Sequence, residues 1–291
     1  MALSPRRAQR LAPLLAPFAD PGAWAGRIAA DPLEFPRRYS EPRDVEVVGL
    51  LAASLAYGRA DVFRPKVAGL LETLGPHPAR AVQSLTVAKA AKWLDGWVYR
   101  FNLGSDLAVL LLGMGEQLRR HGSLDAAFGA GLDGDLRSAL ATFSDGIRGA
   151  APLKEITRAM GKPRAVQHLL PSKGGASKRL LLYLRWMVRG PDAVDLGVWT
   201  SVAPSQLIIP LDTHVARVSR WLGLTRRRDL SWTTALDITA SLRAFDSADP
   251  VRFDFALCHF GMSGACPARP SPDNCRRCPL KGECSVGRRL R

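Results

Sequence analysis

The sequence predicts an all-α fold that ends in a loop-rich tail containing four cysteines. Apolar residues recur at helical spacing through most of the 291 residues, and no segment alternates apolar and polar residues over the length of a strand. Pairs such as Gly75-Pro76 and Gly190-Pro191 separate the helical stretches. A composition of 47% hydrophobic and 23% charged residues is typical of a globular protein with one or two domains.

The expected helices follow one another along the chain. Residues 44–57 place Val47, Leu50 and Leu51 on one face, with Asp44 available as the N-cap. The same periodicity recurs in 62–74, 79–94, 106–119, 134–148, 178–189, 212–222 and 232–244. A tight glycine-containing hairpin, Pro171–Ala176, precedes the helix that we expect to begin near Ser177.

The charge balance points to a polyanionic partner. Lys and Arg number 41 against 26 Asp and Glu, a net charge of +15, which favours DNA or RNA over an acidic membrane surface. The alternative is that base composition has enriched arginine and that the charge is merely solvated. No apolar run approaches the roughly 20 residues that span a bilayer. The N-terminal arginines are followed by no secretory signal pattern. We therefore expect a cytoplasmic protein without membrane contact.

Four cysteines near the C-terminus predict a metal centre. In a reducing compartment, clustered thiols indicate metal binding rather than disulfides. Cys266, Cys275, Cys278 and Cys284 are separated by eight, two and five residues. Four thiolates suit Zn or an iron-sulfur cluster, and their spacing does not choose between the two, although [4Fe-4S] is our first choice. Free structural thiols are the alternative. Cys258 stands apart in an apolar segment, and we expect it to be a buried core thiol.

Basic side chains lie between these cysteines. Arg276 and Arg277, held on a metal-pinned loop, would meet DNA phosphates with little entropy to lose. Their other possible role is to offset the negative charge of a thiolate cluster, and both roles can hold at once.

The glycine hairpin is a second expected DNA contact. A small-residue turn before a helix presents backbone N–H groups to an anion, so it would bind phosphate without reading sequence. Many helical proteins turn with Gly-Gly, so the motif alone is weak. The expected contact residues are Lys173, Gly174, Gly175, Ala176, Ser177 and Arg179.

Two residues are catalytic candidates. Lys178, in the first helical turn, would have its pKa lowered by the helix dipole and its basic neighbours, which frees the amine as a nucleophile. A solvated first-turn lysine is the alternative. Asp212 is most simply an N-cap, and a capping carboxylate would also stabilise positive charge on a sugar ring. We expect Thr213 and His214 to pack beside it.

In this order, the motifs resemble the helix-hairpin-helix DNA glycosylases of base-excision repair, especially endonuclease III and the adenine glycosylases. Gly174-Gly175-Ala176-Ser177-Lys178 is similar to their hairpin, with Ala176 in place of a glycine. Pro-Leu-Asp-Thr-His at 210–214 resembles their Val-Asp-Thr-His, and the cysteine tail resembles the end of their cluster motif. The likeness covers most of the chain from residue 44, and is closer to a largely uncharacterised bacterial branch.

This resemblance implies a two-domain glycosylase fold. A six-helix barrel would occupy 44–189, and a second helical domain with a [4Fe-4S] cluster would combine 1–43 with 190–291. The active site would lie between them, bordered by an insertion at 190–206. Tyr57 falls near the position of a residue that wedges into the base stack.

The implied function is a DNA glycosylase with AP lyase activity. The protein would be a nucleoid-associated monomer that acts on double-stranded DNA with a damaged or mispaired base, with Lys178 attacking the sugar and Asp212 assisting. One rival is a DNA-binding protein of the same fold without the chemistry. Another is a zinc-dependent RNA-binding protein, which would be colourless.

Overall fold

The computed structural model describes residues 3–172 and 174–290, and this part of the chain is mostly helical, which confirms the all-α class. The helices are α1 (Pro5–Leu15), α2 (Pro42–Leu55), α3 (Ala60–Leu74), α4 (Pro78–Gln83), α5 (Val87–Trp93), α6 (Gly104–His121), α7 (Leu124–Gly129), α8 (Leu136–Ala150), α9 (Leu153–Met160), α10 (Val166–Leu169), α11 (Lys178–Val188), α12 (Thr213–Leu222), α13 (Trp232–Leu242), α14 (Asp254–Met262) and α15 (Pro272–Arg276). Short 3-10 turns η1 (Ala16–Phe18), η2 (Gly22–Ala30), η3 (Pro32–Glu34) and η4 (Pro36–Arg38) link α1 to α2, and η5 (Pro204–Gln206) and η6 (Lys281–Glu283) follow later.

Helix α6 forms the centre of the first half of the molecule. It is buried along most of its length, with α4 and α8 packed against it. Glycine is required where these helices meet. A Cβ on Gly113 would lie 2.1 Å from the Ile147 carbonyl oxygen, and one on Gly115 would lie 2.1 Å from that of Val82. The two glycines therefore let three helix backbones approach closely.

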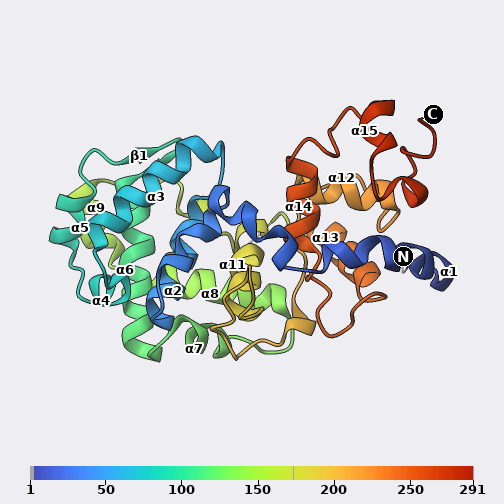
Figure 1. Ribbon diagram of the computed structural model, residues 1–291. Coiled ribbons are helices and arrows are strands. Elements are labelled where there is room, and N and C mark those ends of the chain that lie inside the picture. Colours follow the sequence, from blue (N-terminus) through green and yellow to red (C-terminus); the bar gives the residue numbers. More distant parts are fainter. Residues whose placement is uncertain (1–2, 173, 291) are drawn as a thin grey trace.

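Helices α2 and α11 lie between the two halves of the molecule. Figure 1 shows α3 to α9 on one side, α12 to α15 with α1 on the other, and α11 between them. All residues of α2 from Asp44 to Leu55 are buried, and α11 packs along this helix. The side chains at the start of α11 therefore emerge where the two halves face each other.

Asp44 does not cap α2, so that prediction was wrong. The helix begins at Pro42, and Glu41 occupies the N-cap position. The Asp44 carboxylate instead accepts a hydrogen bond from the backbone N–H of Ala79 at 2.7 Å, at the start of α4. A proline early in a helix needs no donor partner, which explains the earlier start.

Other elements differ from the sequence prediction, which also did not include α1, α7, α9, α10 and α15. The helix expected at 79–94 is broken after Gln83, because the Thr86 hydroxyl accepts from Lys89 N–H and starts a new helix. Strands β1 (Val98–Tyr99) and β2 (Asn102–Leu103) form an antiparallel hairpin that is too short to show an alternating pattern. The sequence prediction treated residues 255–260 as an apolar segment and included no helix there, whereas the structure has helix α14.

The N-terminal helix packs against the C-terminal part of the chain. Arg7 Nη2 donates to the Leu222 carbonyl at 2.7 Å, and Arg10 Nε lies 2.7 Å from Glu283 Oε1. These contacts join the N-terminal segment to the elements after residue 190, while the division into two domains stays a prediction. None of the helices in 3–172 and 174–290 combines the length and apolarity needed to cross a membrane.

Candidate active site and cysteine pocket

A pocket of about 850 Å³, counting space open to solvent, lies where α11, α12 and α14 meet. Its other walls come from Asp31 and neighbouring residues before η3, and from the connection between α2 and α3. The residues that line it and can take part in chemistry are Asp31, Lys178, Arg185, Asp212, His214, Asp254, Cys258 and His259.

Lys178 is the first residue of α11, as the sequence predicted for a helix beginning near Ser177. Ser177 has a left-handed backbone with φ of 49°, which turns the chain sharply into the helix. The Lys178 side chain is 33% exposed, and its Nζ lies 4.0 Å from Asp212 Oδ2. Two residues 34 positions apart are thus brought together in one pocket.

Asp212 caps α12, which confirms the predicted N-cap. Its Oδ1 accepts hydrogen bonds from the backbone N–H groups of His214 and Val215, both at 2.8 Å. Because this oxygen is held by the helix, Oδ2 is left to face Lys178. One carboxylate therefore starts a helix and places a negative charge beside an amine.

Cys258 is part of the pocket, so the prediction of a core thiol was wrong. Its side chain is partly exposed, and its Sγ donates to Asp212 Oδ2 at 3.3 Å. Burial, and then the negative charge of Asp212, raise the pKa of this thiol well above its usual value. The thiol therefore remains protonated and can act as the donor.

Helix α14 supplies further ionisable groups that the sequence analysis missed. Asp254 Oδ2 accepts from Arg185 Nη1 at 2.5 Å, and Arg185 Nε also donates to Asp195 Oδ1 at 3.1 Å. His259 Nε2 lies 3.2 Å from Asp31 Oδ2. The sequence contains one feature that could have indicated these groups. Asp254 precedes Cys258 by four residues in an apolar segment, a spacing that places both on one face of a helix.

The glycine hairpin leads directly into Lys178. Gly174 and Gly175 have φ of 77° and 57°, and both are exposed. None of the hydrogen bonds between described residues uses the backbone N–H groups of 174–177. Helix α8 holds the arm before the turn, because Ser144 Oγ donates to the Pro171 carbonyl at 3.1 Å. Lys173 lies outside the described residues.

Arg179 and Tyr57 are engaged within the protein. Arg179 Nη1 donates to the Ser54 carbonyl at 3.1 Å, and its guanidinium lies over the Tyr57 ring. The Tyr57 hydroxyl donates to Asn102 Oδ1 at 2.7 Å. The aromatic side chain that emerges here is Phe101, which is 49% exposed and stacks on Tyr57 with ring centroids 5.5 Å apart. Phe101 lies in the turn between β1 and β2.

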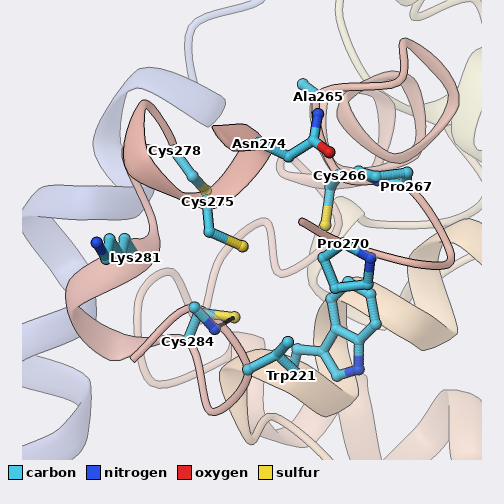
Figure 2. Close-up of a pocket in the computed structure, with 12 residues that line it drawn as sticks. Trp221, Ala265, Cys266, Pro267, Pro270, Asn274, Cys275, Cys278, Lys281 and Cys284 are labelled. Atoms are coloured by element: carbon cyan, nitrogen blue, oxygen red, sulfur yellow. Dashed lines mark hydrogen bonds between the residues drawn. The ribbon is translucent and has the colours of Figure 1, made fainter. Parts of the chain in front are cut away.

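The four tail cysteines line a second cavity of about 310 Å³, counting space open to solvent. Figure 2 shows the sulfurs of Cys266, Cys275 and Cys284 directed into this shared space. Burial, together with neighbouring thiols, raises the pKa of Cys266 to about 11. No group of three or more His, Cys, Asp or Glu side chains among the described residues has the arrangement of a single metal-ion site.

Helix α12 connects this cysteine pocket to the first pocket. It begins at Asp212, and Trp221 near its other end lines the cysteine pocket. Arg217 Nη2 donates to the Cys266 carbonyl at 2.8 Å, and the N–H of Ser285 donates to the Trp221 carbonyl at 2.8 Å. The cysteine tail is therefore fixed to the helix that carries Asp212.

Arg276 and Arg277 both lie on the exposed surface beside the cysteine pocket. Arg276 forms an exposed ion pair of 3.3 Å with Asp273. The 190–206 segment does not line the Lys178 pocket, so the prediction that it borders the active site was wrong. Its Asp195 instead supports Arg185 from the buried side.

A family model described as "Protein of unknown function (DUF2400)" matches residues 31–263, about four-fifths of the chain. The chain therefore belongs to the DUF2400 family. No helix-hairpin-helix glycosylase family matches, so the assignment to that superfamily was wrong. A helix start, a capping aspartate and a cysteine spacing are short local patterns, and they did not identify the family. No curated protein matches the chain, and no solved structure does.

Proposed function

We propose that this DUF2400 protein excises a damaged or mispaired base from DNA and nicks the strand, with Lys178 as the nucleophile. The observation that carries the proposal is the distance of 4.0 Å between Lys178 Nζ and Asp212 Oδ2 in a shared pocket. An amine beside a fixed carboxylate can attack a sugar carbon while the carboxylate stabilises the developing positive charge.

In the proposed reaction, the neutral Lys178 amine forms a bond to C1′ as the bond from C1′ to the base breaks. Opening of the sugar ring gives an iminium between Nζ and C1′. Loss of a C2′ proton then expels the 3′ phosphate by β-elimination, which nicks the strand. The Asp212 carboxylate would stabilise the positive charge on the reacting carbon, because its Oδ1 is held in place by two backbone N–H groups.

DNA binding is supported by the surroundings of the pocket. The exposed Gly174 and Gly175 present N–H groups with no partner among the described residues, and such groups can bind a backbone phosphate. The half-exposed Phe101 offers an aromatic face to an unstacked base. The net charge of +15 attracts the DNA polyanion at longer range. We propose that the protein acts as a nucleoid-associated monomer in two helical domains, 44–189 and 1–43 with 190–291.

The cysteine pocket fits a [4Fe-4S] cluster, with Cys266, Cys275, Cys278 and Cys284 as the proposed ligands. The donor set is four thiols around one cavity. Burial raises the pKa values of Cys266, Cys275 and Cys278, so a strong positive charge would be needed to convert these three to thiolates. The Gly287 N–H donates to Cys284 Sγ at 3.3 Å, as is common around cluster sulfurs. The cluster would supply a rigid charged core for the tail, and Zn is the alternative.

Borohydride trapping on DNA containing an abasic site tests the lysine chemistry. The wild-type protein should form a stable covalent adduct, because borohydride reduces the iminium between Lys178 and the sugar. Lys178→Gln should form none and should still bind the same DNA. Lys154→Gln is the matched control, because Lys154 is an exposed lysine on α9 outside the pocket.

An adduct in Lys178→Gln, or none in the wild type with any of a panel of lesion-containing duplexes, would overturn the proposal. In the second case, retained DNA binding would favour a binding protein without chemistry. Preference for RNA together with bound Zn would favour the zinc-dependent RNA-binding protein.

A further inference from the structure

The α14 wall of the Lys178 pocket holds a buried carboxyl group with one unsatisfied oxygen. Asp254 is 2% exposed. Its Oδ2 accepts from Arg185 Nη1 at 2.5 Å, whereas its Oδ1 is buried and has no hydrogen-bond partner among the described residues. Leaving a buried carboxylate oxygen without a donor is costly, so this oxygen is available to take up a proton or a further donor.

Asp254 lies on the same helix face as the thiol that touches Asp212. Cys258 follows Asp254 by one turn of α14, and positions four apart project to the same side. The Cys258 Sγ reaches Asp212 Oδ2, the oxygen that is 4.0 Å from Lys178 Nζ. Asp254 and Lys178 both line the pocket. The carboxyl group and the amine therefore belong to one pocket.

The charges that face Asp254 come from each wall of the pocket. Helix α11 contributes Lys178 and Arg185, and the start of α12 contributes Asp212. His259, on α14 like Asp254, pairs with Asp31, which precedes η3. Burial raises the pKa of Asp254 to about 6, although Arg185 acts in the opposite direction. A carboxyl group that exchanges its proton near neutral pH is suited to acid and base catalysis.

We propose that Asp254 carries a proton from Lys178 to the departing base, an inference that rests on the proposed function. First, one proton passes from the Lys178 ammonium to the Asp254 carboxylate, which leaves a neutral amine and a carboxylic acid. The amine lone pair then forms the bond to C1′. The base leaves with the electron pair of its own bond to C1′ and takes the proton from Asp254, which ends as a carboxylate.

Arg185 positions the Asp254 carboxyl group, and Asp195 supports Arg185 from outside the pocket. Arg185 holds Asp254 Oδ2, so that Oδ1 remains available for the proton. Asp195 binds the same arginine but does not line the pocket. Substituting Asp195 would therefore disturb the same buried ion network without removing the proton carrier, which makes it a matched control.

The test measures the rate of base release and borohydride trapping at saturating DNA, from pH 5 to pH 8. The wild-type rate should fall on the acidic side with a midpoint near pH 6, where Asp254 becomes protonated. Asp254→Ala should lose about 10²-fold or more at pH 7. Formate should restore the rate in a concentration-dependent way, because it can accept a proton beside Arg185. Chloride, which supplies only charge, should not. Asp195→Asn should keep the acidic limb.

Wild-type rates in Asp254→Ala, or equal rescue by formate and chloride, would overturn the inference. Asp254→Asn, which keeps the size of the side chain, serves if the alanine variant fails to fold, and it should lose the acidic limb.

A separate measurement distinguishes this inference from the proposed function. Reductive methylation of Lys178 by formaldehyde, mapped by peptide mass spectrometry, reports the free amine without DNA. In the wild type, the fall in labelling with decreasing pH should become shallower near pH 6, where Asp254 gains its proton, and this inflection should be absent in Asp254→Asn. If DNA trapping fails but the inflection is present, only the proposed reaction is wrong. If trapping succeeds but the inflection is missing, the proton transfer is wrong.

Discussion

Asp212 combines two roles that substitution can separate. Asp212→Asn keeps a side-chain oxygen that can accept from His214 and Val215, so its unfolding free energy should stay close to that of the wild type. The neutral amide places no negative charge beside Lys178, so covalent trapping should fall by about 10²-fold or more. Asp212→Ala should lose the chemistry and also about 1 kcal/mol of stability. Denaturant unfolding and trapping measure the two effects.

Equal loss of stability in both variants would show that the charge, rather than the hydrogen-bonding oxygen, holds the start of α12. Trapping at the wild-type rate in Asp212→Asn would remove the carboxylate from the mechanism.

At the level of single residues, the sequence revealed the groups that have local signals. Lys178 begins a helix and Asp212 caps one, and both positions follow from residues immediately beside them. Asp254 and Cys258 gave no such signal, because their meeting with Lys178 depends on how α14 packs on α12. Phe101 was missed because Arg100, and not glycine, takes the positive φ of its turn.

Glu46 on α2 makes the stability of the fold depend on pH. Its carboxylate accepts from the N–H groups of Leu124 and Asp125 at the start of α7. Burial raises the pKa of Glu46 from 4.5 to about 6, so the folded state binds more protons than the unfolded state between these values. Stability should therefore rise by about 1 kcal/mol as the pH falls from 6 to 4.5. The raised pKa of Asp254 acts in the same direction.

Thermal melts between pH 4.5 and pH 7 measure this dependence. Glu46→Gln should flatten it, because an amide does not titrate. Glu116→Gln is the control, since Arg119 and Arg120 lower the pKa of Glu116 and its contribution is lost only below pH 4.5. An unchanged slope in Glu46→Gln would show that Glu46 does not cause the effect.

At the level of elements, long periodic helices were predictable and their interruptions were not. The starts of α11 and α12 agree with the sequence within a residue or two. Helix α4 ends at Gln83, and α5 begins separately because the Thr86 hydroxyl caps its first turn. Helix α2 begins earlier than predicted because Pro42 is tolerated in a first turn. Asp44 is therefore free to accept a hydrogen bond from the Ala79 N–H at the start of α4.

Across the whole molecule, removal of the cysteine centre should weaken DNA binding more than chemistry. Cys278→Ser should remove the broad visible absorbance expected of a [4Fe-4S] protein and lower the melting temperature. Arg276 and Arg277 precede Cys278 directly and would no longer be held in fixed positions. The plot of log K against log salt should become shallower by about 0.9 in slope for each DNA phosphate that these arginines no longer neutralise.

Cys258→Ser is the control, because Cys258 lies in the other pocket and should leave the metal content unchanged. Trapping by Cys278→Ser at saturating DNA should approach the wild-type rate. A colourless wild-type protein with stoichiometric Zn would contradict the cluster.

The contacts of α1 with the end of the chain also bear on how the protein is made. Arg10 is synthesised 273 residues before its partner Glu283. At about 10 residues per second, a ribosome needs roughly half a minute to supply that partner. During this interval Arg10 lacks its carboxylate partner. This contact between the N-terminal helix and the cysteine tail can therefore form only after Glu283 has emerged, later than the helices around α6.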